Sequence, residues 1–498
     1  MATIDFGAGY PAYPDLASAV AAAGAGGTVR SWGPHTDTVG VYTWPGALSG
    51  ITWLHMGGGD YTFDGGLATL DCLRIDGTGN TLVLLNADGT RVKIKGYGRY
   101  VFWVNAAGNV INDPYLFDNG YVAAGHIRPY MLYANSTIHR PVIASGLDNQ
   151  AYQYGLYISN SNGGLVTDLY IANVNVTGTG RVYAVLSSGS CGRVLIDGVI
   201  LENCSSVAPS YPLSWGGTGA GDVMRVRRAQ IRSLTGPVNS RIGYAYQKGI
   251  DIENFIFDNC GGDGFVFQAP SAFVGDQNRV VNGVIRGMSA SGVSANQLVA
   301  GSAPTIRNVI ARDCVGNGFV SYGTFDPDSD HNVAYNNGTD YSGWTKGAND
   351  LEAVDPLQAD PANGDYTLLS DSPCIGTGET IAGMRYDIGG IERPQGANFD
   401  IGPHEYPAEV IDLVNKFAVA TGSAGTIVAG ENTFSDAAAD FQLPDANHKL
   451  YIYNCIAANA GLANINSVDS ATQVVTDKTF STDPQSGSIK WALFLVAQ

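Results

Sequence analysis

A sixteen-residue stretch occurs twice in this chain, and its recurrence limits the possible folds more than any other feature. Residues 252–267 read IENFIFDNCGGDGFVF and residues 306–321 read IRNVIARDCVGNGFVS, with eight identical positions at an offset of 54 residues. A third copy, VVNGVIRGMSASGVSA at residues 280–295, lies between them, so the underlying period is near 27 residues. A period of about 20–50 residues is typical of a solenoid, in which each unit buries its apolar face by stacking on its neighbours.

Each copy contains an asparagine that is followed ten residues later by a glycine. These asparagines are Asn254, Asn282 and Asn308, at spacings of 28 and 26 residues. The chain also contains weaker matches, and we place further members of the series at Asn173, Asp197, Arg228 and Asn332. The spacings are then 24, 31, 26, 28, 26 and 24 residues, which predicts coils of nearly constant length.

The pattern within a unit favours strands over helices. Apolar residues alternate over short spans, and no stretch of ten or more residues has the i, i+3, i+4 spacing of an amphipathic helix. Gly, Asn and Asp recur every five to eight residues, as tight turns require. We therefore predict an all-β fold, a parallel β-helix with three short strands per coil. Such a stack must align Phe265, Val293 and Phe319 along one axis.

Three cysteines follow a polar residue at corresponding points of separate units. Because stacked strands lie about 4.8 Å apart, we expect the polar side chains to form a hydrogen-bonded ladder and the cysteines to be buried as small apolar groups. The predicted structural ladder consists of Asn203, Cys204, Asn259, Cys260, Asp313 and Cys314. Seven Cys without a CxxC pair argue against a disulfide framework and a Cys-based zinc site, so we expect no metal and no cofactor.

Composition argues against two classes of partner. The net charge is −18, and the one basic run is RVRR at residues 225–228, so we expect no nucleic-acid partner. No run reaches the roughly 18 apolar residues of a membrane-spanning helix, so we expect no membrane insertion. The first residues lack the basic and apolar regions of a secretory signal, which predicts a protein made in a cytoplasm and kept there or released by lysis.

The N-terminal residues predict a cap over the first coil, because a solenoid would otherwise expose unpaired strand edges. Asp15 or Pro14 can start a short helix. Gly24–Gly27 ends it, and Thr28–Trp32 then has the pattern of the first strand. The helix has one apolar face, formed by Leu16, Ala19, Val20 and Ala23.

The two ends of this region carry a family resemblance. The N-terminal side has GGTVRSWG, GVYTWPG and then Asn-rich coils, and residues 355–406 contain NGDYTLLSDSPCIGTG followed by YDIGGIERPQGANFDIGPHEY. This resembles the right-handed parallel β-helix superfamily, whose members often close with such a segment. The resemblance covers about residues 10–406 and implies a fold without implying a reaction.

Four segments are expected. Residues 1–35 form the N-terminal cap, and residues 36–406 form the β-helix, with 355–406 as its closing segment. Residues 407–420 form a linker. Residues 421–498 alternate apolar and polar residues between Gly, Asn and Asp breaks, which predicts a small antiparallel β domain for attachment or oligomerisation. This last segment resembles the compact β domains of phage virion proteins.

Carboxylates are the groups through which β-helix glycosidases act, one as acid and another as base or nucleophile. The repeat alignment places Glu202, Asp258 and Asp263 on one side of the stack, so these are the candidate catalytic residues; a solvated edge of charges is the alternative. The adjacent Asp pair and Gly-His-Gly turn of polygalacturonases are missing. So is the calcium-binding Asp cluster of pectate lyases.

Tyrosine-rich stretches point to a binding surface, because aromatic rings suit both sugar faces and protein interfaces. We expect Tyr152, Tyr154 and Tyr157 to face outward and bind glycan; core or subunit packing is the alternative.

The pattern as a whole resembles tailspike and fibre proteins of bacteriophages. The resemblance implies a structural virion protein, a spike, fibre or decoration protein that binds host cell-surface polysaccharide. It also implies a homo-oligomer, with a trimer favoured, and contacts to other virion proteins through the C-terminal domain. A polysaccharide depolymerase (a glycoside hydrolase or lyase) on the same scaffold and a bacterial surface adhesin are the alternatives, and the sequence leaves an enzymatic activity open.

Overall fold

The chain divides, in the computed structural model, into two compact units, Met1–Ala353 and Val354–Gln498. The structure describes residues 2–37, 42–68, 72–97, 100–119, 128–132, 135–146, 153–159, 163–176, 181–188, 194–215, 224–245, 250–268, 279–296, 304–322, 328–407, 418–427, 433–435, 448–453, 461–470, 473–476 and 485–495.

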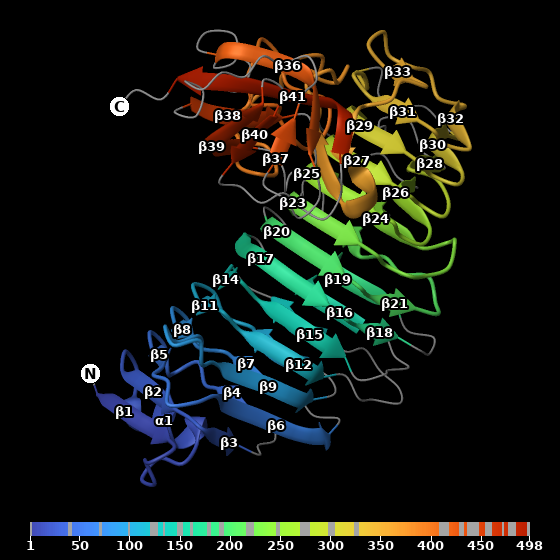
Figure 1. The fold of residues 1–498 in the computed structure, drawn as a ribbon. Helices are drawn as coiled ribbons and strands as arrows, with labels where there is room; N and C mark the ends of the chain where they lie inside the picture. The colour runs from blue at the N-terminus through green and yellow to red at the C-terminus, as the bar shows by residue number, and fades with distance from the viewer. Residues whose placement is uncertain are drawn as a thin grey trace. The chain divides into compact units, whose positions relative to one another are not determined.

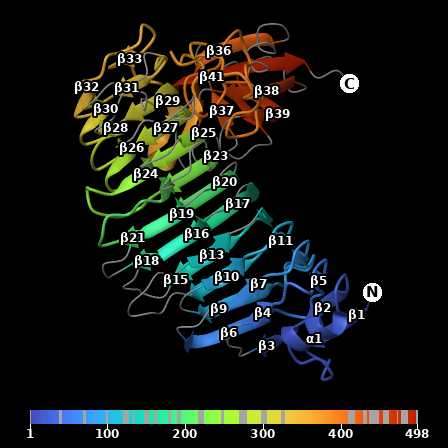
Figure 2. The ribbon, with the colours of Figure 1, turned by 180° about the vertical axis from the view of Figure 1, so that it is seen from behind.

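The first unit is a right-handed parallel β-helix, as predicted, in which the chain winds repeatedly between two large sheets (Figures 1 and 2). Sheet B contains β4 (Tyr42–Trp44), β7 (Leu73–Ile75), β10 (Tyr100–Val104), β13 (Arg128–Leu132), β16 (Gln153–Ser159), β19 (Val182–Ser188), β22 (Leu213–Trp215), β24 (Arg241–Ala245), β26 (Asp263–Gln268), β28 (Val293–Asn296), β30 (Asn317–Ser321) and β32 (Thr339–Ser342). Each strand pairs in parallel with the strand of the next coil.

Sheet A is larger, because it receives two strands from each of the early coils. Those early strands are β1 (Thr3–Gly7), β2 (Thr28–Trp32), β3 (His35–Asp37), β5 (Thr52–His55), β6 (Tyr61–Ala68), β8 (Thr81–Val83), β9 (Val92–Tyr97), β11 (Val110–Asn112), β12 (Tyr115–Asn119), β14 (Thr137–His139) and β15 (Val142–Gly146). The later coils contribute one strand each: β17 (Gly164–Ala172), β20 (Val194–Glu202), β23 (Met224–Arg232), β25 (Ile250–Asp258), β27 (Arg279–Arg286), β29 (Thr305–Arg312), β31 (Val333–Tyr335) and β33 (Leu351–Glu352).

Proline accounts for the divided strand in two of the early coils. Pro114 separates β11 from β12, and Pro141 separates β14 from β15, because proline has no N–H to donate to a ladder. Asp113 and Arg140, which precede these prolines, have positive φ, as Asp168 has in β17 at φ 52°. No proline follows Asp168, and β17 continues through the bend. The prediction of three strands per coil is therefore correct for the early coils, whereas the first two strands are fused in the later ones.

The predicted alignment of three apolar residues along one axis is confirmed. Phe265 pairs with Val293, and Val293 pairs with Phe319, so the three residues lie in one column on successive coils. All three are fully buried. Their column includes Gly243 on the preceding coil, where a Cβ would approach the Phe265 ring to 2.2 Å, so glycine leaves room for the ring.

The repeat register differs from the predicted series at three of its four outer positions. Pairing aligns Asn254, Asn282 and Asn308 with each other and with Arg228, as predicted. The other members of this column are Asp168, Gly198 and His331, in place of the predicted Asn173, Asp197 and Asn332. Every residue of the column has a positive φ, so a backbone bend, which Asp, Gly, Arg or His can also make, recurs even where asparagine does not.

The predicted ladder residues occupy alternate coils, with other residue types between them. Cys204, Cys260 and Cys314 are buried, and Leu234 and Met288 fill the same position on the intervening coils. The residues that precede these cysteines, Asn203, Asn259 and Asp313, all have positive φ, between 53° and 56°. Of these three, Asp313 makes a direct ladder hydrogen bond, because it accepts from Asn336 Nδ2 of the next coil at 2.7 Å. Other pairs form the same bond: Asn308 Nδ2 donates to Asn282 Oδ1 at 2.8 Å, and Asn80 Nδ2 donates to Asn109 Oδ1 at 2.9 Å.

The N-terminal helix forms as predicted, but the first strand precedes it. Helix α1 (Leu16–Ala23) begins after Asp15, which accepts a hydrogen bond from Ser18 N at 2.7 Å, and ends at Gly24. Its predicted apolar face is buried. The sheet begins with β1 and not with Thr28–Trp32, because β1 pairs in parallel with β2. No helix among the described residues is long and apolar enough to span a bilayer.

The second unit contains the closing segment and a small antiparallel domain, so the boundary expected at 406/407 lies inside it. In the closing segment β34 (Gln358–Asp360) pairs with β35 (Asp365–Leu368) through the turn η1 (Pro361–Asn363). The remaining strands form a closed barrel: β36 (Ala418–Ile427), β37 (Thr433–Ser435), β40 (Gln473–Thr476), β39 (Gly461–Ser470), β38 (His448–Tyr453) and β41 (Gln485–Leu495). Closure gives each barrel strand two partners and leaves no free edge.

Candidate functional site

Charged residues on sheet A are paired across coils. Asp251 accepts hydrogen bonds from Arg225 Nε at 2.7 Å and from Arg279 Nη2 at 2.8 Å, and register places these three residues on successive coils. Glu253 pairs with Arg227 and, at 3.2 Å, with Arg279. Burial raises the pKa of Glu253 despite these arginines. Both carboxylates are buried, so their charges depend on the arginines for compensation.

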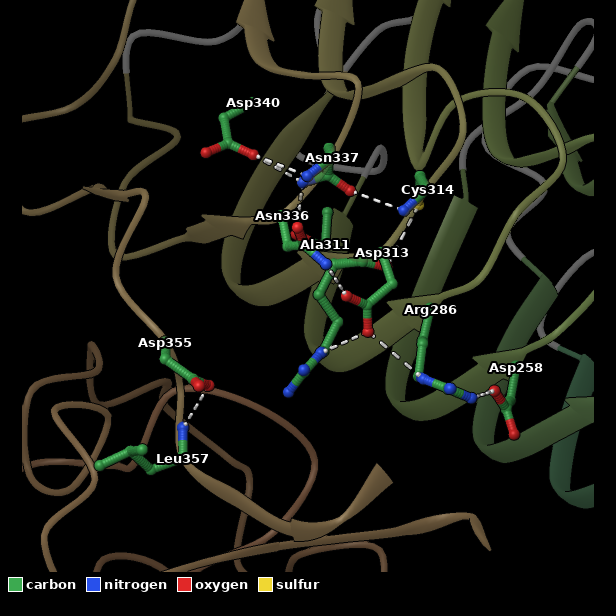
Figure 3. A network of polar contacts seen from close by, with 11 residues as sticks. Asp258, Arg286, Ala311, Asp313, Cys314, Asn336, Asn337, Asp340, Asp355 and Leu357 are labelled. Atoms are coloured by element: carbon green, nitrogen blue, oxygen red, sulfur yellow. Dashed lines mark hydrogen bonds and ion pairs between the residues drawn. The ribbon is translucent and has the colours of Figure 1, made fainter. Parts of the chain in front are cut away.

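A second network lies at the ends of the sheet A strands (Figure 3). Arg286 Nη1 donates to Asp258 Oδ1 at 2.9 Å, and Arg286 Nε lies 3.5 Å from Asp313 Oδ2. Asp313 also accepts from Arg312 Nε at 2.9 Å and from Asn336 Nδ2 at 2.7 Å. Asp258 is therefore a member of an ordered network, and its carboxylate is neutralised by an arginine of the next coil.

The structure does not gather the three predicted catalytic carboxylates into one site. Glu202 and Asp258 share a column of sheet A, but Arg232 occupies the coil between them, which puts their backbones about 10 Å apart. Glu202 accepts a hydrogen bond from the Tyr170 hydroxyl at 2.5 Å. Asp263 begins β26 in sheet B and accepts from Ser291 N at 2.8 Å. Their catalytic role stays a prediction.

Burial is the main influence on Asp263. It raises the pKa of this carboxyl, against the opposing effects of the Ser291 N–H and the Arg241 charge. Arg241 is the register partner of Asp263 on the preceding coil. A carboxyl with a raised pKa is suited to proton donation, and among the three candidates Asp263 has this property.

The predicted glycan-binding tyrosines are described to different extents. Tyr152 lies outside the described residues. Tyr154 is in β16 and pairs with Tyr183 of β19. Tyr157 is half-buried, and its neighbours in the strand, Leu156 and Ile158, are in the core, so alternation turns Tyr157 to the outer face of sheet B.

Three tyrosines of the next coils form a stack: Tyr183 in β19, Tyr211 just before β22, and Tyr244 in β24. Ring centroids of Tyr183 and Tyr211 are 5.9 Å apart, and those of Tyr211 and Tyr244 are 5.2 Å apart. The guanidinium carbon of Arg181 lies 4.9 Å from the Tyr211 ring centroid. Tyr183 is buried, whereas the other two rings are half-buried, so part of the stack reaches solvent.

Arg241 and Gln268 complete this group. The guanidinium carbon of Arg241 lies 4.5 Å from the Tyr244 ring centroid. Gln268 Oε1 accepts from Arg241 Nη1 and from the Tyr244 hydroxyl, both at 3.1 Å. We call the group the tyrosine–arginine cluster; its members are Arg181, Tyr183, Tyr211, Arg241, Tyr244 and Gln268. It combines aromatic faces with cationic hydrogen-bond donors, which are the groups that bind sugars and their acidic substituents.

The sequence contained a signal for this cluster. Tyr183, Tyr211 and Tyr244 are 28 and 33 residues apart, close to the coil length, and Arg181 and Arg241 precede two of them by two and three residues. Reading the tyrosines with the repeat period, instead of by local density, would have found them.

A buried charge cluster organises the closing segment. Asp387, Asp400 and Glu405 are almost fully buried, and Arg393 Nε lies 3.4 Å from Glu405 Oε1. Each carboxylate accepts backbone N–H groups: Asp387 from Glu405, Asp400 from Tyr406, and Glu405 from Asp400. No group of three or more His, Cys, Asp or Glu in the described part of the chain is arranged to hold a metal ion. The three carboxylates therefore form a buried hydrogen-bond network that joins parts of the closing segment.

Comparisons with known proteins add a structural neighbour. The sequence matches no protein-family model and no curated protein. A solved structure titled "Crystal structure of pectate lyase Pel9A" aligns with a TM-score of 0.39 and 12% identity, over 81% of this chain and 96% of that chain. The fold assignment rests on the strand pairing of the chain itself.

Proposed function

We propose that the solenoid binds a polysaccharide along the outer face of sheet B, with the tyrosine–arginine cluster as its centre. The observation that carries this proposal is the stack of Tyr183, Tyr211 and Tyr244 on neighbouring coils. A linear polymer presents the same chemical group at regular intervals, and a solenoid presents side chains at a regular spacing of about 4.8 Å per coil. Rings aligned with that spacing suit successive sugars of one chain.

Binding of glycans to the full-length protein tests the proposal. We expect the double variant Y211A/Y244A to lose binding on a glycan array, because stacking area is removed from two neighbouring coils. The matched control is Tyr322→Ala, since Tyr322 is 72% exposed and outside the cluster. Equal binding by the double variant and the wild type, with circular dichroism unchanged, would remove the basis of the proposal.

We also propose that the chain is a spike, fibre or decoration protein of a bacteriophage or phage-like particle, located on the virion. The closed barrel of β36–β41 is a separate module without free strand edges, which suits docking to another virion protein or trimerisation of the solenoid. Host cell-surface polysaccharide is the proposed partner. We expect capsid or tail genes to flank the gene of this chain, and we expect light scattering to give the mass of a trimer. Unrelated flanking genes would contradict the virion role, and the mass of a monomer would contradict the oligomer.

A polysaccharide depolymerase is the second candidate, and Asp263 favours it. This carboxyl has a raised pKa and pairs in register with Arg241 of the cluster, so a bound polymer would lie near a proton donor. Release of reducing ends from a bound polysaccharide, abolished in Asp263→Asn with binding intact, is the expected result for an enzyme. Binding of the polysaccharide without release of reducing ends would contradict the depolymerase and support a protein that only binds.

A further inference from the structure

Arg241 differs from most arginines in the described part of the first unit, because it forms no ion pair with a carboxylate there. Ten arginines in the described part of that unit form ion pairs: Arg30, Arg74, Arg140, Arg225, Arg227, Arg228, Arg279, Arg286, Arg307 and Arg312. The hydrogen-bond partner of Arg241 is instead the neutral amide of Gln268. The acid that faces it, Asp263, is engaged by the Ser291 N–H.

The surroundings of Arg241 fix its guanidinium, and the Asp263 carboxyl interacts with its charge without forming an ion pair with it. The Tyr244 ring supports its face, and Gln268 Oε1 takes a hydrogen from Nη1 while also accepting from the Tyr244 hydroxyl. A guanidinium has five N–H donors, and this arrangement leaves several for a ligand. A guanidinium whose orientation is fixed can bind a carboxylate or a sulfate through two parallel hydrogen bonds.

We propose that Arg241 selects an anionic sugar, one that bears a carboxylate or a sulfate, and that Gln268 is the positioning residue that holds Arg241 for this contact. The inference rests on the proposed binding of a polysaccharide to the tyrosine–arginine cluster. It adds the class of the polymer: an acidic polysaccharide, in spite of the net charge of −18 carried by the whole chain. We assign this role to Arg241 and not to the ion-paired arginines, because the charges of those arginines are already matched by acids of the protein.

Matched polymers separate charge recognition from stacking. The full-length protein is titrated calorimetrically with hyaluronan, alginate and polygalacturonate, with the same polymers after their carboxyls are reduced to alcohols, and with dextran sulfate alongside dextran. We expect at least one acidic polymer to bind about tenfold more tightly than its neutral counterpart. Arg241→Met should abolish that difference, so that the acidic polymer and its neutral counterpart bind with equal affinity.

Arg232→Met is the control, because Arg232 Nη2 likewise donates to a glutamine, Gln230, at 2.9 Å, but on sheet A. This variant should retain the preference for acid. A preference that survives in Arg241→Met, or equal affinities of the wild type for acidic and neutral polymers, overturns the inference. If Y211A/Y244A binds every polymer as the wild type does, the proposed function itself fails, which is a separate result.

The role of Gln268 has its own readout. Gln268→Glu supplies Arg241 with an internal carboxylate, so affinity for the acidic polymer should fall about tenfold at pH 7 and recover as pH falls toward the ordinary Glu pKa of about 4.3. Gln268→Met should weaken binding at both pH values. A merely structural role of Gln268 predicts the same loss in both variants at every pH, and that outcome would overturn the positioning role.

Discussion

The two sheets of the solenoid use arginine in different ways. On sheet A, Arg225 and Arg279 both bind the buried Asp251. Each of these arginines is one coil away from the carboxylate that it binds. On sheet B, Arg241 is stacked on a tyrosine and hydrogen-bonded to an amide. The same residue type therefore joins coils in the Asp251 network, whereas Arg241 forms no ion pair with a described carboxylate.

This difference separates stability from binding along one repetitive scaffold. A solenoid is stabilised mainly by contacts between neighbouring coils, so ion pairs between coils contribute to its cohesion. A charge without a partner contributes little to cohesion but keeps its full interaction with a ligand. Substitution of a paired arginine on sheet A should therefore reduce stability more than polymer binding. Substitution of Arg241 on sheet B should reduce polymer binding more than stability.

The largest expected effect is on the stability of sheet A. Arg279→Met removes a partner from both Asp251 and Glu253, and because both carboxylates are buried we expect a loss of about 3 kcal/mol in the free energy of unfolding. Arg241→Met on sheet B should cost less than about 1 kcal/mol. Urea unfolding and hydrogen exchange of β25 and β27 measure both. Similar losses in the two variants would mean that the sheets do not differ.

The closing segment gives a third arrangement, in which one arginine faces three buried carboxylates. Burial raises the pKa of Glu405 to about 7, with Asp400 adding to the shift and Arg393 opposing it. Because the folded pKa exceeds the unfolded value of 4.5, stability is fully present below pH 4.5 and is lost as pH rises through 7.

The expected loss is on the order of 2 kcal/mol across this window. Hydrogen exchange at the amides of Asp400 and Gln395, which donate to Glu405, reports it locally. Glu405→Gln keeps a neutral acceptor and should make the profile flat. A wild-type profile that is flat from pH 4.5 to 7 would contradict the raised pKa of Glu405.

Asp258 tests whether the strand-end network of sheet A is structural or catalytic. Asp258→Asn weakens the ion pair with Arg286, and we expect a loss of about 1–2 kcal/mol with no change in polymer binding. Arg286→Met, which removes the partner, should give a loss of the same sign. If Asp258→Asn leaves stability unchanged but stops release of reducing ends, Asp258 is a catalytic residue as the sequence predicted.

The sequence was sufficient for the later coils and insufficient for the early ones, for a backbone reason. Between Asn254 and Asn308 each coil bends at one residue with positive φ, and asparagine occupies it three times, so the period is visible. In two of the early coils Asp113 and Arg140 make this bend, at φ 58° and 49°, and the proline that follows each of them divides the strand. The period is preserved there, but no residue type marks it.

The site could be predicted in part, because repeats reveal columns but not partners. Tyr154 pairs with a member of the cluster, and Tyr157 faces outward, so tyrosine density indicated the sheet that contains the tyrosine–arginine cluster. Whether Arg241 is paired with an acid depends on side chains 27 residues apart, such as Gln268, and no local pattern contains that information. The same limit explains why Glu202 and Asp258 looked like neighbours although Arg232 stands between them.

The smallest expected effect concerns a hydrogen bond on sheet A in which the carboxylate is the charged partner and no arginine takes part. Tyr170 donates to Glu202 Oε1, and this bond raises the pKa of Tyr170 to about 12. The raised value means that the contribution is present below pH 10 and is lost as pH rises through 12. Tyr170→Phe should cost less than about 1 kcal/mol, because the pair is half-exposed and water can replace the hydroxyl. Glu202→Gln should lower the tyrosine pKa, measured by ultraviolet titration, with a similarly small loss of stability. A loss of several kcal/mol in Tyr170→Phe would show that hydrogen bonds between coils without an arginine stabilise the solenoid as much as the arginine pairs, and the contrast drawn from the arginines would then fail.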